Sequence, residues 1–161
     1  MSEDLEIPVL AATAYNGPIV HLLEAVKRRG HHRPLRYVAR TILPVALDHT
    51  AGPLYPVPAS CRGRRIRGFD QMVVVARHTG RAYQPVFVRR RGRQQKQLNR
   101  RLRLRNAEET LALRPHGMPR YPSGIVVDDV LTTGATVSRA ISLLRNVGVS
   151  PSAVVVIAAA L

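Results

Sequence analysis

The sequence predicts an α/β domain with a parallel sheet, and its C-terminal part carries most of that prediction. Residues 125–128 begin with Ile125-Val126-Val127, a β-branched run that is typical of a buried parallel strand. Residues 135–147 then repeat apolar side chains at helical spacing, and residues 153–160 form a second apolar run. A strand, a helix and a strand in this order make a βαβ unit, whose two strands run parallel.

The N-terminal part predicts an arm followed by a helical hairpin. We interpret residues 1–14 as an arm, within which residues 7–12 could instead make a short strand. Pro18 is placed to open a helix whose apolar repeat ends at Gly30. Residues 35–47 predict a second amphipathic helix, which Pro44 should kink or restart.

The middle of the chain predicts short elements separated by loops. Residues 54–55 favour a short buried strand, which the prolines at positions 56 and 58 terminate. We expect residues 59–71 to form a loop whose four arginines either hold an anion or are simply solvated. Residues 72–79 then predict a helix, and residues 84–88 and 111–113 predict strands.

Length and composition fit a single domain that covers residues 1–161. No apolar run reaches the ~20 residues of a membrane helix, and the acidic N-terminus has the wrong sign for a secretory signal. We therefore expect a cytoplasmic protein without membrane insertion. Cys61 is the single cysteine, so we expect no internal disulfide and no zinc.

The charge balance favours a polyanionic partner. The chain has 25 Lys and Arg against 10 Asp and Glu, which gives a net charge of +15. The stretch from Arg89 to Arg105 has 9 basic residues among 17 and no acidic one. It could bind single-stranded DNA, or it could be a solvated, flexible flap. It contains no aromatic residue on which bases could stack.

Residues 125–136 combine features that suit a phosphorylated sugar. Asp128 and Asp129 stand where the strand is expected to end, and the carboxyl ends of parallel strands line the ligand crevice. Thr132-Thr133-Gly134 then open into a helix N-terminus, whose free N–H groups favour a phosphate. Two acids beside such a cradle need a partner that is not an anion, such as sugar hydroxyls or a divalent metal ion.

In this order the segment resembles the phosphoribosyl diphosphate (PRPP) signature of the type I phosphoribosyltransferases. The resemblance implies that Asp128 and Asp129 bind the ribose hydroxyls and take part in catalysis, with Mg²⁺ entering with PRPP near them. It also implies that one loop binds the 5′-phosphate, through Leu131, Thr132, Thr133, Gly134, Ala135 and Thr136.

Further blocks are similar to the ComF-type competence-protein branch of that family, and together they reach from about residue 15 to the C-terminus. They are Tyr15-x-Gly17-Pro18, Pro56-Val57-Pro58, Arg67-Gly68-Phe69-Asp70-Gln71 and Gln95-x-x-Leu98-x-x-x-x-Arg103-x-x-Asn106. Two departures stand out. The N-terminal zinc ribbon of the family is missing, and Asp70 replaces its asparagine, adding a negative charge that could alter acceptor or anion binding.

This resemblance implies a type I phosphoribosyltransferase-like fold, in which helices flank a parallel sheet of about five strands. An N-terminal helical segment and a flexible basic hood over residues 89–106 would complete the fold. The diphosphate would contact Pro56, Val57, Pro58, Arg64, Arg65 and Arg67. The acceptor site and catalytic loop would contain Phe69, Asp70, Gln71, Gln95, Arg103 and Asn106.

The expected function is that of a ComF-type protein that binds PRPP, transfers or holds its phosphoribosyl group, and is associated with DNA uptake in natural transformation. The alternative is a non-catalytic accessory protein that binds single-stranded DNA and keeps the PRPP pocket. A transcriptional regulator is a third reading, for which no helix-turn-helix pattern is present. The sequence does not identify the acceptor or show whether turnover occurs. It also leaves the oligomeric state undecided, and a homo-oligomer is one of the options.

Overall fold

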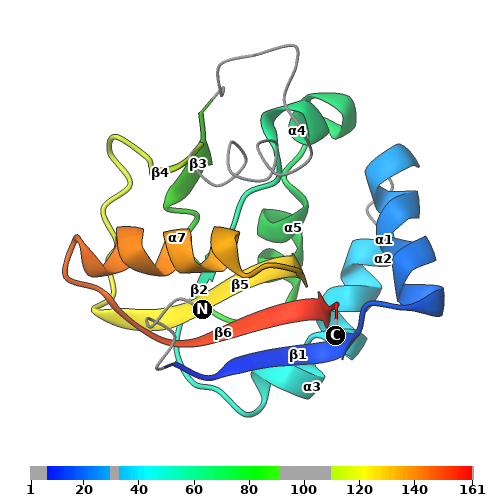
Figure 1. Cartoon of the computed structure of the whole chain (residues 1–161), viewed down its shortest axis with the longest axis horizontal. Helices are drawn as coiled ribbons and strands as arrows, with labels where there is room; N and C mark the ends of the chain where they lie inside the picture. The colour runs from blue at the N-terminus through cyan, green and yellow to red at the C-terminus, as the bar shows by residue number, and fades with distance from the viewer. Residues whose placement is uncertain (1–6, 30–32, 91–109, 161) are drawn as a thin grey trace.

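The centre of the fold is a parallel sheet of four strands in the order β1-β6-β5-β2, with helices on both faces (Figure 1). The structure is a computed structural model that describes residues 7–29, 33–90 and 110–160. The sheet consists of β1 (Val9–Ala14), β2 (Leu54–Pro56), β5 (Ser123–Leu131) and β6 (Ser150–Ala159). The expected α/β class and the parallel β5–β6 pair are confirmed.

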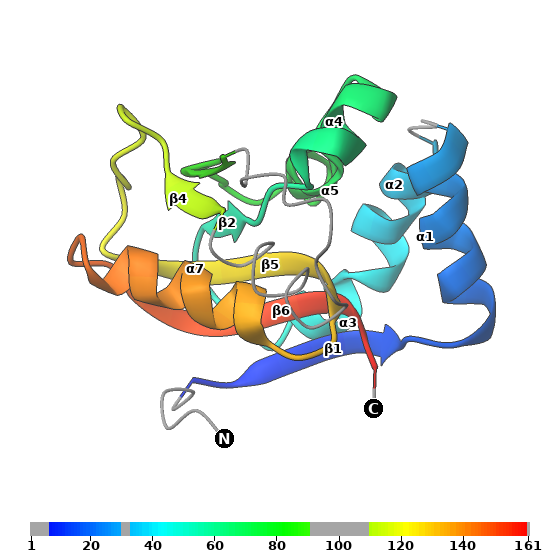
Figure 2. The ribbon, with the colours of Figure 1, turned by 45° about the horizontal axis from the view of Figure 1, so that its top comes forward.

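The remaining elements surround this sheet. The helices are α1 (Gly17–Arg29), α2 (Arg33–Tyr37), the π-helix η1 (Val38–Ile42), α3 (Pro44–Leu47), α4 (Cys61–Arg67), α5 (Gln71–His78) and α7 (Ala135–Arg145). An antiparallel ribbon of β3 (Phe87–Arg89) and β4 (Leu111–Leu113) lies with α4 on the β2 side of the sheet, away from β1 (Figure 2). None of the helices in the described ranges is long and apolar enough to cross a membrane.

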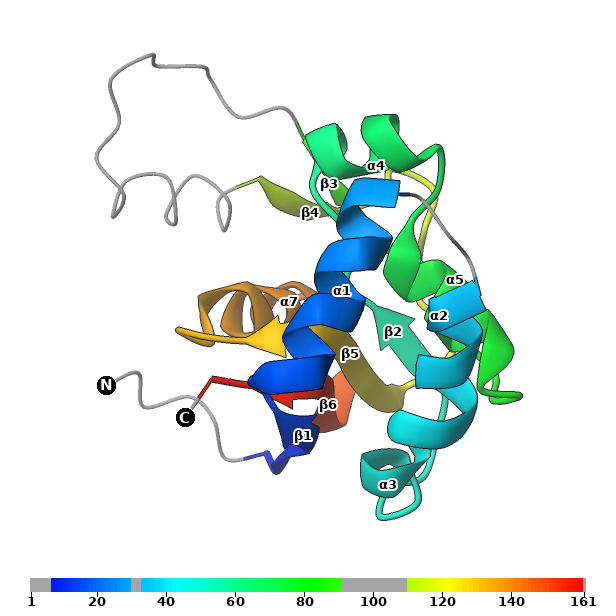
Figure 3. The ribbon, with the colours of Figure 1, turned by 90° about the vertical axis from the view of Figure 1, so that its right-hand side faces the viewer.

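Alternation along the strands divides the core into two layers. Val126, Val154 and Val156 pack with the apolar side of α7. Ile125, Val127 and Val155 face the opposite way, toward α1, α2, α3 and α5. Figure 3 shows α7 on one side of the sheet and α2, α3 and α5 on the other. Both faces of β5 and β6 are therefore buried, which explains their nearly continuous apolar sequence.

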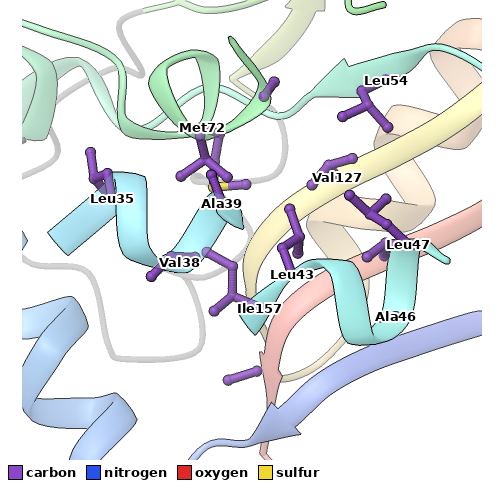
Figure 4. Close-up of a cluster of buried hydrophobic side chains, with 14 of the residues drawn as sticks. Leu35, Val38, Ala39, Leu43, Ala46, Leu47, Leu54, Met72, Val127 and Ile157 are labelled. Carbon is purple, nitrogen blue, oxygen red and sulfur yellow. The ribbon is translucent and has the colours of Figure 1, made fainter. Parts of the chain in front are cut away.

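The break expected at Pro44 is present as a π-helical turn. Leu43 N–H donates to Val38 O at 2.8 Å, five residues back, and Pro44 then starts α3. Since proline has no N–H to donate, the wider turn lets the chain continue without an ordinary helical bond at that position. The buried side chains of this segment pack with Met72, Val127 and Ile157 (Figure 4).

Two expectations about strands were correct only in part. The strand alternative at residues 7–12 is confirmed and the arm is wrong for residues 9–14, because β1 pairs with β6 along its length. Of the strand expected at residues 84–88, residues 87–88 belong to β3, and the sheet gains only a bridge between Tyr83 and Leu54, so in the described residues it has four strands rather than about five. Pro85 has no N–H for further pairing. The chain then leaves the sheet, and residues 87–89 pair with β4 instead.

The loop expected at residues 59–71 is also wrong, because its centre forms α4. Ser60 caps this helix by accepting a hydrogen bond from Gly63 N–H at 3.1 Å. Gly68 ends it with a positive φ of 77°, and its N–H donates to Arg64 O. These two end signals outweigh the weak helix propensity of the glycine inside the element.

Candidate functional site

The acid pair lies within β5 rather than after it. Val130 and Leu131 still pair with β6, so the strand passes through Asp128 and Asp129 before it ends. The sequence prediction placed the strand end too early, because backbone pairing does not depend on side-chain polarity. Beyond β5 the chain turns back directly into the N-terminus of α7 (Figure 1).

Asp128 is almost fully buried, with 8% of its surface exposed. Its Oδ1 accepts a hydrogen bond from Asp129 N–H at 2.8 Å. Burial raises the pKa of Asp128 well above its usual value, and the neighbouring charge of Asp129 raises it further. The positive charge of Arg89 acts in the opposite direction. A ligand that donates hydrogen bonds or brings positive charge would therefore be favoured beside this carboxyl group.

Asp129 points toward the other face of the sheet, as alternation along a strand requires. Its Oδ2 accepts a hydrogen bond from Gln71 Nε2 at 2.5 Å, and its Oδ1 accepts one from Val130 N–H at 2.8 Å. Gln71 is the first residue of α5 and is only 4% exposed. The sequence had placed Gln71 with the acceptor site or loop; the structure places it against the acid pair.

Arg89 joins three parts of the candidate site. It stands at the end of β3, its Nε donates to Pro58 O at 2.9 Å, and its charge acts on Asp128. The Pro56-Val57-Pro58 segment, which begins in β2, is itself fixed to β5, because Val57 N–H donates to Val127 O at 2.8 Å. The sequence predicts Arg89 only as the start of the basic stretch. Nothing in the neighbouring residues indicates its contact with Pro58 or its effect on Asp128.

Asp70 has a structural role that the sequence did not suggest. Its Oδ1 caps α5 by accepting from Met72 N–H at 3.2 Å, and its Oδ2 accepts from Ala59 N–H at 3.2 Å. Burial raises the pKa of Asp70, while these backbone hydrogen bonds and the charge of Arg64 lower it. Asparagine and aspartate cap helices about equally well. Asp70 therefore joins the segment after Pro58 to the start of α5, as an asparagine at this position could also do.

The arginines of α4 lie in different surroundings. The positive charge of Arg64 lowers the pKa of Asp70, and the side chain of Arg65 is exposed. The Arg67 guanidinium folds back over Gly63, so that a Cβ added there would lie 2.7 Å from it. Arg67 Nε is buried without a partner among the described residues. Phe69 packs against the core. A contact of these residues with diphosphate or an acceptor stays a prediction.

The loop before α7 leaves the start of the helix without a side-chain cap. Thr132 and Thr133 are exposed, and Gly134 has a positive φ of 76° with no side-chain cap. The first bond of the helix runs from Ser138 N–H to Gly134 O at 2.9 Å. The N–H groups of Ala135, Thr136 and Val137 therefore have no acceptor within the helix. Such a helix start is suited to bind a phosphate.

Three predicted site residues, Gln95, Arg103 and Asn106, lie outside the described residues, as does the basic stretch from position 91 onward. In the described ranges, no three His, Cys, Asp or Glu side chains gather where they could hold a metal ion. Mg²⁺ in phosphate sites is commonly held by one or two carboxylates together with substrate oxygens and water. A single carboxyl group, that of Asp128 or that of Asp129, would meet that smaller donor set.

Comparison with known proteins adds no further information about this site. No protein-family model matches the chain, and no curated protein matches it.

Proposed function

We propose that the protein binds PRPP at the junction of β5 and α7, as a ComF-type member of the type I phosphoribosyltransferases. The observation that carries this proposal is a pair of acids in β5, one buried and one partly buried, followed after a short loop by an uncapped helix start. Asp128 and Asp129 occupy the end of β5, and the N–H groups of the first turn of α7 follow after the glycine at position 134. Ribose 5-phosphate carries matching groups in the same order, with hydroxyls on the ring for the acids and a phosphate at C5 for the helix start.

Each part of the site would meet a different part of the ligand. The ribose hydroxyls donate hydrogen bonds to Asp128 and Asp129, where a donor is favoured because burial and mutual repulsion oppose two free charges. The 5′-phosphate accepts bonds from residues 132–136 at the helix start. Mg²⁺, when bound with PRPP, would neutralise part of the diphosphate charge.

The same arrangement supports transfer of the phosphoribosyl group. As the diphosphate leaves C1 of the ribose, positive charge develops on the sugar ring, and the carboxylates of the acid pair stabilise that charge. Arg89 lies between the acid pair and Pro58, so its guanidinium would counter the negative charge of the departing diphosphate. The site would fix the geometry of the donor, and the proposal names no acceptor.

Isothermal titration with PRPP and Mg²⁺ tests this proposal. Asp129→Asn should weaken binding by about 10- to 150-fold, which corresponds to the ~1.5–3 kcal/mol of a hydrogen bond to a charged group. Asp48→Asn is the control, because it removes one exposed carboxylate from the C-terminus of α3 without touching the site. If the unaltered protein does not bind PRPP, the proposal is wrong.

The alternative function, binding of single-stranded DNA, is supported by the net charge of +15 and the run from Arg89 to Arg105. The affinity should then fall steeply with salt, in proportion to the number of phosphates neutralised. Reversing the charges of Arg100, Arg101 and Arg103 should abolish that binding while PRPP binding persists. Equal DNA affinity before and after the reversal would exclude this stretch as the contact surface.

A further inference from the structure

The buried glutamine at the start of α5 has a role that its packing alone does not explain. Gln71 is one of two buried polar or charged residues in the described ranges, and the other is Asp128 of the acid pair. Gln71 and Asp129 are 58 positions apart in the sequence, so tertiary structure alone brings them together. Buried polar groups in proteins normally have a hydrogen-bond partner for every strong donor and acceptor.

One half of the Gln71 amide lacks such a partner. Its Oε1 is shielded from solvent and accepts no hydrogen bond from any described residue. The other half fixes the orientation, because Nε2 donates to the carboxylate of Asp129. Turning the amide over would bring two acceptor oxygens together, which is unfavourable. Oε1 is therefore an acceptor held beside Asp129, and it requires a donor.

A sugar hydroxyl meets this requirement. It carries one donor hydrogen, and ribose has two adjacent hydroxyl groups at C2 and C3. One hydroxyl can donate to Asp129 while its neighbour donates to the glutamine oxygen. A positively charged group would be drawn to the carboxylates rather than to a neutral amide. A phosphate oxygen is an acceptor and could not bind there.

We propose that Gln71 is a specificity-determining residue whose Oε1 accepts a hydrogen bond from a ribose hydroxyl, so that the site selects ribose over deoxyribose. This inference rests on the proposed function, since it names a further contact in the same site. A site with a buried acceptor for a hydroxyl rejects a ligand without that hydroxyl, because the acceptor then stays unpaired.

The test compares ribose 5-phosphate with its 2-deoxy and 3-deoxy analogues, each titrated into the unaltered protein and into Gln71→Met. Methionine has nearly the same length but no amide. The unaltered protein should prefer ribose 5-phosphate to both analogues. Gln71→Met should reduce the preference over one analogue by about three- to tenfold, the effect of one neutral hydrogen bond. Inorganic phosphate, which has no hydroxyl-bearing sugar, should bind both proteins equally.

Val75→Ala is the matched control, because Val75 lies on the same helix and is fully buried. It should lower the melting temperature and leave the preference unchanged. If Gln71→Met does not fold, Gln71→Asn gives the same comparison, since its amide is one methylene shorter and cannot reach the ligand.

The outcomes separate this inference from the proposed function. If the unaltered protein binds ribose 5-phosphate but Gln71→Met keeps the full preference, the inference is wrong and the proposed function stands. The inference is also wrong if Gln71→Met weakens all three sugar phosphates and inorganic phosphate by one common factor, because Gln71 then acts only on folding. If the unaltered protein binds none of these sugar phosphates, both ideas fail.

Discussion

Replacing Gly134 with alanine tests directly whether the start of α7 binds a phosphate. Gly134 has a φ of 76°, and a Cβ added there would meet only Leu131 Cδ1, at 3.9 Å. Space is therefore not the obstacle. The penalty is conformational, about 1–2 kcal/mol for an L-residue in the left-handed region. For a chain of this length that corresponds to a melting temperature lowered by about 2–8 °C.

Ligand binding should decrease by a separate amount. Alanine tends to leave the left-handed region, which would turn the neighbouring N–H groups away from the phosphate, and its Cβ would face the ligand. Losing one N–H bond to a charged group weakens binding by about 1.5–3 kcal/mol, or 10- to 150-fold. Titration with PRPP and with ribose 5-phosphate measures this loss, and thermal unfolding measures the stability.

Gly148 provides the matched control at the other end of the same helix. Its φ is 81°, and a Cβ there would meet nothing within 4 Å. Gly148→Ala should therefore lower the melting temperature by a similar amount and leave binding unchanged. Equal affinity of both variants for the sugar phosphates would refute the assignment of the phosphate to this loop.

Substitutions at three further positions have defined outcomes. Asp128→Asn should stabilise the protein at neutral pH. The raised pKa of Asp128 means that its carboxyl group keeps its proton to a higher pH in the folded state than in the unfolded chain. The free energy of unfolding of the unaltered protein therefore falls as the pH rises from the usual carboxyl pKa through the raised pKa. Denaturant unfolding across pH should show a larger fall in the unaltered protein than in the variant, which keeps the raised pKa of Asp70. Asp70→Asn should retain the cap of α5, whereas Asp70→Ala should lose about 0.5–2 kcal/mol of unfolding free energy; equal losses would show that the cap contributes nothing. Gly124→Ala should lower the free energy of unfolding by about 1–3 kcal/mol in the same assay. The added Cβ would lie 2.7 Å from both Pro53 O and Tyr55 Cε2. An unchanged denaturation midpoint would contradict that close packing.

Local sequence was a good guide where each element is specified by its own residues. The β5–α7–β6 unit was predictable because its strands are continuous apolar runs and its helix has an unbroken apolar stripe. The break at Pro44 follows from the missing N–H of proline.

Local sequence misled where pairing or capping across a distance decides the structure. Residues 84–88 have strand composition, yet Pro85 allows only one bridge to β2 before the chain pairs elsewhere. The arginine-rich segment was read as a loop because its charges hide the cap at Ser60 and the end signal at Gly68. In the first case a missing backbone N–H decides the structure, and in the second a side-chain cap and a backbone hydrogen bond decide it. Side-chain hydrophobicity gives no clue to any of these.

By itself the sequence determined that two acids precede an open helix start, because those residues are neighbours along the chain. Only the tertiary structure decided what surrounds them. Alternation along β5 turns Asp129 toward Gln71 and leaves Asp128 under the influence of Arg89, although neither partner is near in sequence. The physical reason is that a strand fixes the direction of its own side chains, whereas the groups they meet depend on how distant helices and strands pack on each face of the sheet.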